Sequence, residues 1–210
     1  LDELPRYQRA VDGLVLPVAV ATHPALDFCN TLTGWHGAPE REYLESYDHL
    51  VVWARESGLV DETSATALRN AARRDPEAAR RALEQARSLR SALYRACTDA
   101  ADRKAWDAVA RATRTASAHA VLSPDGAPGR RWSVATDVGL ERPVLEVARE
   151  AGDLLATLDL RHVRACPGTG CGWLFLDPRG RRRWCTMAVC GNRAKARRHA
   201  SRARGDTTDV

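Results

Sequence analysis

The 210-residue chain lacks several features that would assign it to a familiar functional class. It has no apolar run near the roughly 18 residues that a membrane span needs, and no apolar leader-like segment at its start. It also has no HExxH, GxSxG, phosphate-binding-loop or dinucleotide-binding motif. We therefore expect a protein of the reducing cytoplasm, with no membrane association and no enzymatic activity.

Acidic residues are nearly missing from one part of the chain. Between Arg161 and Arg204, eleven arginines and one lysine accompany a single acid, Asp177, whereas the preceding residues hold 20 basic and 24 acidic side chains. The formal net charge of +5 therefore arises in this C-terminal segment. A zinc ion bound by four thiolates has a formal charge of −2, so it would offset only two of the positive charges of this segment. Such a cationic segment favours an anionic partner, above all nucleic acid.

Four of the six cysteines lie in this segment, in the pattern C-x4-C-x13-C-x4-C. Close pairs of thiolates are typical of structural zinc sites, because each pair closes a short chelate loop around a tetrahedral ion. The predicted zinc ligands are Cys166, Cys171, Cys185 and Cys190, and the alternative is a set of four incidental thiols. The other two cysteines, Cys29 and Cys97, are isolated in apolar surroundings, as core positions are.

The residues around the four cysteines predict a treble-clef-like finger. A proline and two glycines between the first two cysteines allow the tight turn of a metal knuckle. Residues 172–177 (GWLFLD) alternate as a strand does, and residues 177–180 (DPRG) supply a turn. Residues 182–185 (RRWC) are expected to return as the partner strand. A helix is expected to begin near Cys190.

The preceding residues predict a mainly α-helical domain with a small β-sheet or hairpin. Helices are indicated by capping residues and by apolar residues that recur every three to four positions, and strands by apolar alternation beside turns. The expected strands lie within residues 14–22 and in a hairpin at 120–136, and the expected helices cover residues 24–32, 46–58, 61 onward, 76–101, 106–118 and 144–158. The chain thus divides into a helical effector or oligomerisation domain (1–160), a zinc finger (161–204) and a disordered tail (205–210).

The predicted helix after Cys190 carries basic residues on most of its faces and has little apolar surface to bury. It is suited to binding phosphates, and a solvated helix without a partner is the alternative. Asn192 has the geometry to read adenine, or else it fixes the zinc loop by bonding to the backbone. Trp173, Phe175 and Trp184 are candidates for stacking on bases, although a small zinc module also needs a hydrophobic core. The predicted nucleic-acid contacts are Arg181, Arg182, Arg183, Asn192, Arg193, Lys195, Arg197, Arg198 and Arg202.

Two polar residues interrupt the apolar pattern of residues 24–32. Asp27 and Asn30 lie about one turn apart on the expected helix, so they are candidates for a pocket that binds a small-molecule effector. The alternative is structural, with both side chains capping neighbouring helix ends or pairing with an arginine to lock the domain. A third interpretation makes Cys29 a nucleophile with His23 or His36 as its base, but the periodicity directs Cys29 into the core.

The motifs of the chain resemble those of a known family. CGWLFLD at 171–177 and CGNR at 190–193 are similar to the CGNR-type zinc finger, and HPALDFCNTL at 23–32 is similar to the start of the ABATE domain that precedes this finger in bacterial proteins. Proteins of this family are described as stress-induced transcription regulators. The resemblance implies that the four cysteines bind zinc and that the finger binds DNA.

Together these observations favour a zinc-dependent transcription regulator that binds double-stranded DNA and senses a small ligand or stress signal through its N-terminal domain. A single finger covers only a few base pairs, so a homodimer is expected. The alternative function is an RNA-associated or protein-binding zinc module without specificity for duplex sequences.

Overall fold

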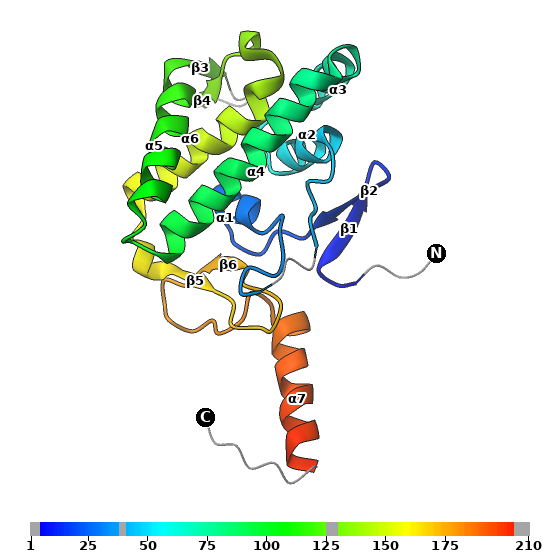
Figure 1. The fold of residues 1–210 in the computed structure, drawn as a ribbon, viewed down its shortest axis with the longest axis vertical. Coiled ribbons are helices and arrows are strands. Elements are labelled where there is room, and N and C mark those ends of the chain that lie inside the picture. The colour runs from blue at the N-terminus through cyan, green and yellow to red at the C-terminus, as the bar shows by residue number, and fades with distance from the viewer. Residues whose placement is uncertain (1–4, 38–40, 125–129, 204–210) are drawn as a thin grey trace.

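The computed structural model describes residues 5–37, 41–124 and 130–203. The predicted disordered tail lies outside the described residues, as does Arg204. Helices pack together in residues 5–160, here called the helical region, and residues 161–203, here called the finger, cover one end of it (Figure 1). The architecture is mainly α-helical with small antiparallel strand pairs, as the sequence predicts.

The helices of the helical region follow the predicted pattern. Their starts are set by capping, since the side chains of Ser46, Asp61 and Asp75 accept hydrogen bonds from backbone amides in the first turns of the helices that follow them. The helices are α1 (Pro24–Cys29), α2 (Tyr47–Glu56), α3 (Glu62–Arg74), α4 (Pro76–Thr98), α5 (Arg103–Ala118) and α6 (Arg142–Thr157). Within the residues described, no helix combines the length and the apolar character that crossing a bilayer requires.

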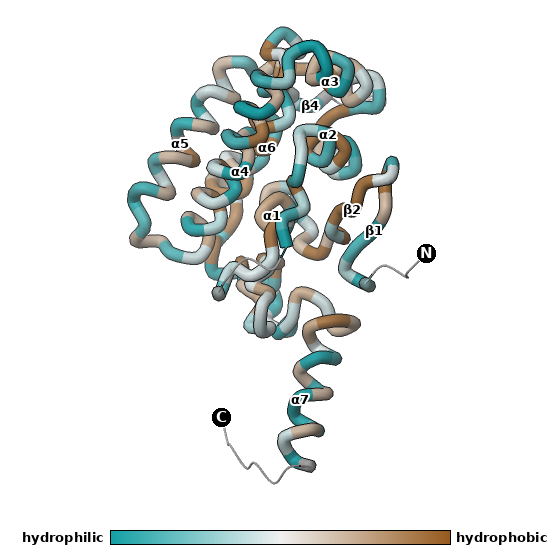
Figure 2. The backbone as a smooth tube through the Cα atoms, turned by 45° about the vertical axis from the view of Figure 1, so that its right-hand side comes forward, coloured by the Kyte–Doolittle hydropathy of each residue, from teal (hydrophilic) through white to brown (hydrophobic). Residues whose placement is uncertain are grey.

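The long helix α4 runs through the middle of the helical region and contacts α1, α2, α3, α5 and α6. Its buried side chains include Leu83, Ala86, Leu89 and Leu93, which the periodicity predicts. Figure 2 shows hydrophobic and hydrophilic stretches alternating along these helices, as expected for helices that bury one face. The core therefore forms around α4.

An ion pair between a buried arginine and a partly exposed glutamate holds the loop after α1 against α4. The guanidinium of Arg90, only 3% exposed, donates to both carboxylate oxygens of Glu42 and to the backbone oxygen of Thr31. Removing Glu42 would leave the buried Arg90 charge uncompensated, which costs about 3–5 kcal/mol in a fully buried pair and less here because Glu42 is 28% exposed. The described parts of this loop thus have a fixed position, and they contact the finger.

Two antiparallel hairpins belong to the helical region. β1 (Gln8–Val11) pairs with β2 (Leu14–Pro17), and β3 (Ala120–Pro124) pairs with β4 (Arg130–Val134). The second hairpin is as predicted. The first contains the predicted strand only as far as Pro17, and its partner β1 has no counterpart among the predicted strands.

The finger departs from its predicted hairpin. β6 (Leu174–Leu176) pairs with β5 (Val163–Ala165), which precedes the first cysteine, and the prediction that residues 182–185 return as its partner strand is wrong. The reason is Asp177, whose buried carboxylate accepts hydrogen bonds from the backbone amides of Arg181 and Arg182 at 2.9 and 3.1 Å. These bonds curl the chain into a loop.

Beyond this loop the chain forms a π-helical turn (Met187–Gly191) and then α7 (Asn192–Ala203). α7 leaves the body of the molecule and projects away from the helical region (Figures 1 and 2). The predicted helix near Cys190 is therefore present, and most of its surface faces solvent.

Candidate metal centre

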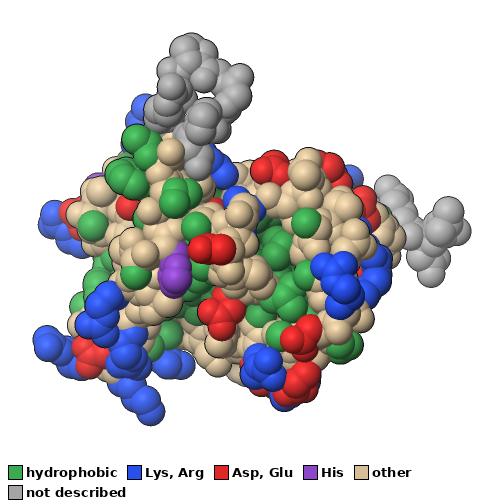
Figure 3. All heavy atoms as spheres, turned by 90° about the horizontal axis from the view of Figure 1, so that it is seen from above, with side chains coloured by type: hydrophobic (Ala, Val, Ile, Leu, Met, Phe, Trp, Pro, Cys, Tyr) green, Lys and Arg blue, Asp and Glu red, His purple; other side chains and the backbone are tan. Residues whose placement is uncertain are grey.

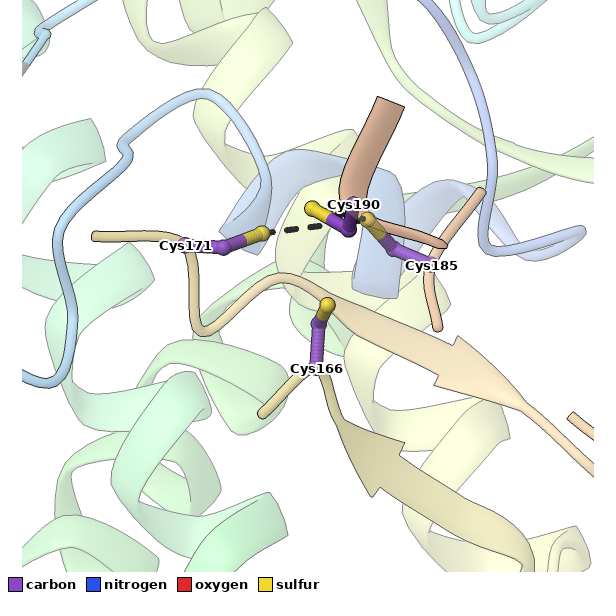
Figure 4. Close-up of side chains that lie close together, drawn as sticks. All are labelled: Cys166, Cys171, Cys185 and Cys190. Carbon is purple, nitrogen blue, oxygen red and sulfur yellow. Dashed lines mark hydrogen bonds between the residues drawn. The ribbon is translucent and has the colours of Figure 1, made fainter. Parts of the chain in front are cut away.

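Four cysteines from separate positions in the finger meet at one point (Figure 4). Cys166 follows β5, and Cys171 ends the tight turn that leads toward β6. Cys185 ends the loop held by the buried aspartate, and Cys190 lies in the π-helical turn before α7. In the turn between the first two ligands, Gly170 has φ +68°, which favours glycine, and a Cβ at Gly168 would lie 3.1 Å from the Cys190 sulfur and crowd the cluster. The hairpin, the loop and the helix start each deliver part of the set.

The positions of the sulfur atoms fit a tetrahedral ion. The Sγ atoms of Cys171 and Cys185 are 3.7 Å apart, those of Cys185 and Cys190 are 3.6 Å apart, and all four ligand atoms lie within 4.8 Å of one another. A Zn–S bond of about 2.3 Å places tetrahedral thiolates about 3.8 Å apart. All four cysteines are free and buried. The cluster therefore has the donors and the spacing of a structural zinc site.

Thiols packed this closely influence one another's ionisation. Hydrogen bonding from Cys171 lowers the pKa of Cys166, whereas hydrogen bonding with Cys166 raises the pKa of Cys185. Without a cation, the thiolates repel one another and some of the sulfurs hold protons. Zinc binds thiolates, so its binding displaces these protons and acid opposes it.

An apolar shell surrounds the cysteines. Tyr43, Trp173 and Phe175 pack against them, and none is more than 2% exposed. Burial raises the pKa of Tyr43 to about 12, so this phenol is neutral at physiological pH. The same burial rules out Trp173 and Phe175 as platforms for stacking on bases, and gives them the core role. Trp184 is partly exposed, and the guanidinium of Arg183 lies 5.2 Å from its ring centroid.

Comparison with protein families supports the metal centre. The ABATE family model, described as "Putative stress-induced transcription regulator", matches residues 22–158, more than half of the chain. The chain belongs to the ABATE family. A second model, the CGNR zinc finger, matches residues 162–203 and includes all four cysteines. With the sulfur geometry, this match identifies the cofactor as zinc. A search of curated proteins found no match.

In this ABATE protein, hydrogen bonds to backbone atoms dock the finger on the helical region. The carboxamide of Asn30, which is fully buried, accepts from the amide of Leu174 at 2.7 Å and donates to its carbonyl at 2.9 Å. The indole of Trp173 donates to the carbonyl of Leu32 at 3.0 Å. Strand β6 is therefore held by a side chain at the end of α1.

The second zinc ligand is held from the same side. The backbone amides of Gly34 and Trp35 donate to the carbonyl of Cys171 at 3.1 and 3.3 Å. The hydroxyl of Tyr94, whose ring stacks on Trp35 at 3.8 Å, donates to the carbonyl of Gly172 at 2.9 Å. Gly172 has φ +74°, and a Cβ there would lie 2.6 Å from the Trp35 Cβ. The sequence predictions omit these docking residues, and the glycine directly after a ligand cysteine is the only local signal for them.

Asp27 and Asn30 each bond to the backbone of a different segment. The carboxylate of Asp27 accepts from the amides of Val20 and Ala21 at 2.8 and 2.9 Å, and it lines a cavity of about 180 Å³ beside His23. Asn30 uses both ends of its carboxamide to dock β6. Both contacts are structural, but they bind the backbone of a segment before α1 and of strand β6, not a helix end or an arginine as the alternative expects. A ligand pocket that uses both side chains stays a prediction.

Cys29 is unsuited to nucleophilic chemistry. Its side chain is fully buried, and burial raises its pKa well above the usual value. His23, one of its two candidate bases, instead caps α1, where its Nδ1 accepts from the amide of Ala25. A buried and protonated thiol is inert, so this interpretation is wrong.

The predicted nucleic-acid contacts differ in whether, within the described residues, their side chains bond to the protein's own backbone or are exposed without such a bond. Arg182 points inward, where its guanidinium donates to the carbonyls of Val20 and Cys185 at 3.1 and 2.7 Å. Asn192 is exposed, but its Nδ2 donates to the carbonyl of Ala188 at 3.2 Å, as its structural alternative predicts. The other predicted contacts are all exposed: Arg181, Arg183, Arg193, Lys195, Arg197, Arg198 and Arg202. The finger thus uses one arginine for its own fold and presents the rest to solvent.

Proposed function

We propose that the protein is a zinc-dependent transcription regulator that binds double-stranded DNA through α7. The family match supports a regulatory role, and the zinc centre supports a finger that folds around its metal. The observation that carries the proposal is the setting of α7, which begins at the zinc centre, projects from the body and exposes its basic side chains (Figure 1).

The dimensions and charge of α7 suit a DNA groove. Its 12 residues span about 18 Å at 1.5 Å per residue, and a major groove about 12 Å wide admits a helix. In the described part of the finger, Asp177 is the one acid among many arginines, so the finger keeps a large net positive charge. Binding phosphates through these cations releases counterions from the duplex.

The first turn of α7 is proposed to face the bases. Asn192 and Arg193 occupy this turn and are exposed. Side chains near the start of a recognition helix contact base edges, while those further along contact phosphates. Arg181 and Arg183, on the loop before the turn, are proposed to contact the adjacent phosphates.

The opposite end of the molecule has a different surface. Seen from above the helical region, acidic, basic and hydrophobic side chains are interspersed (Figure 3). A surface of mixed charge has little net attraction for a duplex. The DNA contact is therefore proposed for the finger end.

We also propose that the protein binds DNA as a homodimer and that the helical region responds to a small ligand. The β3–β4 hairpin supports a contact between copies, because Leu122 and Trp132 lie opposite each other and are each 57% exposed. Sedimentation velocity should show a dimer that Trp132→Ser weakens. A monomer at DNA-binding concentrations would contradict this part of the proposal.

The test of the proposed function is selection of bound sequences from a random duplex pool, with a random RNA pool in parallel. We expect enrichment of a short duplex motif by the zinc-loaded protein and none by the chelated protein. Enrichment from the RNA pool alone would replace the proposal with the RNA-associated alternative.

A further inference from the structure

A pocket of about 410 Å³ lies where the helical region meets the finger. Its walls come from the segment that contains Tyr7 and Gln8, from Thr33 and Arg41 in the parts of the chain that follow α1, and from the finger. The finger contributes the zinc ligands Cys171, Cys185 and Cys190, and Arg193 from α7. Pockets of about 300–1,000 Å³ accommodate small organic ligands. This pocket is thus large enough for a metabolite, and it contacts both parts of the molecule.

The pocket lining contains two cationic side chains beside the zinc centre. It contains two arginines, Arg41 and Arg193, and none of its described lining residues is acidic. The guanidinium of Arg41 lies 5.2 Å from the ring centroid of Tyr43, and that of Arg193 lies 5.6 Å from the ring centroid of Tyr7. The contact of Arg41 with Glu45 is long, at 3.8 Å, and exposed, so it neutralises little of the charge. The lining also includes three ligands of the zinc centre, whose formal charge with four thiolates is −2, so a preference for an anion rests on the hydrogen bonds that guanidinium groups donate to oxyanions and not on a net positive charge.

Two polar groups of the lining residues have no hydrogen-bond partner within the described part of the chain. Thr33, only 8% exposed, has an unpaired Oγ1, and Arg41 has an unpaired and buried Nε. A buried polar group without a partner costs about 1–3 kcal/mol, so such groups call for an explanation. A hydroxyl and a guanidinium N–H can both donate to an oxyanion. Their unpaired state points to a ligand.

We propose that this pocket binds a small organic anion, with a phosphate or carboxylate held by Arg41, Arg193 and Thr33. The apolar part of the ligand lies against Tyr7 and Val189, which also line the pocket. Because zinc ligands form part of the lining, the pocket exists only when the finger is folded around its metal.

A phosphate of the DNA backbone is the other source of this chemistry. Duplex DNA approaches the exposed outer faces of a protein, whereas Thr33 and the Nε of Arg41 are buried. A free anion can enter where a duplex cannot, so the observations favour a small molecule.

The pocket also gives the anion a route to regulation. Arg193 lines the pocket and also belongs to the first turn of α7. An anion held by Arg193 would occupy a cation that the proposed DNA complex uses. The anion should therefore weaken DNA binding, and this consequence rests on the proposed function, whereas the pocket itself does not.

The pocket is tested by calorimetric titration of the zinc-loaded full chain with phenyl phosphate and with benzoate, in the absence of DNA. We expect binding of at least one probe, weakened about tenfold or more by Arg41→Ala, since a charge-assisted contact is lost. The matched control is Arg111→Ala, which removes an exposed arginine of α5 and should leave the affinity unchanged.

Thr33→Val separates a ligand contact from a structural role. This nearly isosteric change removes an unpaired hydroxyl, so the melting temperature of the ligand-free protein should stay the same or rise. Affinity for the probe should nevertheless fall. A structural residue would lose stability and binding together, and that result would overturn the assignment of Thr33.

The proposal is overturned if neither probe binds, or if Arg41→Ala binds both as the wild type does. It is also overturned if Arg41→Ala weakens DNA binding while the wild type binds neither probe, because Arg41 then contacts the DNA backbone. If the wild type binds a probe but no DNA, the proposed function fails and the pocket stands. If DNA binding is weakened by the probe in the wild type and not in Arg41→Ala, both hold.

Discussion

The helical region buries its apolar side chains around α4, whereas the finger has two three-residue strands and a helix that projects into solvent. Core side chains such as Leu50, Leu93 and Leu154 are fully buried in the helical region. The corresponding cluster in the finger consists of the four cysteines with Trp173 and Phe175, and Tyr43 of the helical region completes it. The helical region is thus stabilised by apolar burial, and the finger by its metal and by docking.

This difference explains how the finger can present so much positive charge. A domain with its own hydrophobic core must use one face of each helix for burial. α7 does not need to bury a face, because the finger from which it starts is held by zinc and by the contacts of Asn30 and Tyr94 with the finger backbone. Its surface is therefore free for a partner.

The largest expected effect comes from removing a zinc ligand. Cys185→Ser should abolish zinc binding and unfold residues after about 164, because structural zinc contributes on the order of 10 kcal/mol to the folding of such modules. The helical region should keep its helices. Metal analysis, with hydrogen exchange resolved along the chain, measures both effects. Cys97→Ser, which alters a buried cysteine far along the sequence from the ligands, is the control and should retain zinc.

Lowering the pH should release zinc from the wild type and unfold its finger, as Cys185→Ser does. Because zinc binds thiolates, falling pH protonates the four sulfurs and releases the ion, and only residues of the finger should then lose protection from exchange. Undiminished zinc in Cys185→Ser, or unfolding of the helical region before zinc release, would contradict the division between the two regions.

The next largest effect is expected at the docking contact. Asn30→Ala removes both hydrogen bonds to Leu174 and leaves its buried amide and carbonyl unpaired, so the free energy of unfolding should fall by about 3 kcal/mol. Urea denaturation of the zinc-loaded protein measures the loss. The control Asn70→Ala, at an exposed position on α3, should cost much less. Equal losses in the two variants would mean that docking contributes little.

A smaller effect is expected from two neighbouring arginines of the finger loop, which should differ in their contributions to stability and to DNA binding. Arg182→Ala removes bonds to the carbonyls of Val20 and Cys185 and should lower the free energy of unfolding by about 2 kcal/mol. Arg181→Ala, at an exposed position, should leave stability unchanged and weaken DNA binding. Thermal denaturation and fluorescence anisotropy with duplex DNA separate the two roles. A loss of stability in Arg181→Ala and not in Arg182→Ala would show that the two arginines have the opposite roles.

The helices and the zinc ligands could be predicted from the sequence because their determinants are local. Ser46, Asp61 and Asp75 cap the helices that follow them, and four cysteines in two close pairs define a tetrahedral site. The strand predicted at residues 182–185 rests on the turn signal at 177–180, and it does not form because Asp177 binds the amides of Arg181 and Arg182 and holds this segment as a loop.

The docking contacts and the junction pocket could not be predicted in this way. Asn30 and Leu174 are 144 positions apart, and the pocket combines several separate segments of the chain. Arg41 has no distinguishing neighbour in the sequence, because its environment exists only after the helical region and the finger have packed together. Local pattern therefore identifies the finger, and tertiary packing decides which of its arginines remain available.

The most direct test of the central claim is the salt dependence of duplex DNA binding by the zinc-loaded protein, compared with the triple variant Arg197→Ala, Arg198→Ala and Arg202→Ala. If α7 binds phosphates, the slope of log affinity against log salt should fall by about three in the triple variant. The charge-matched control Arg103→Ala, Lys104→Ala and Arg111→Ala, at exposed positions of α5, should keep the wild-type slope. An unchanged slope in the α7 variant, or an equal fall in the control, would contradict the claim that zinc positions this helix to bind DNA.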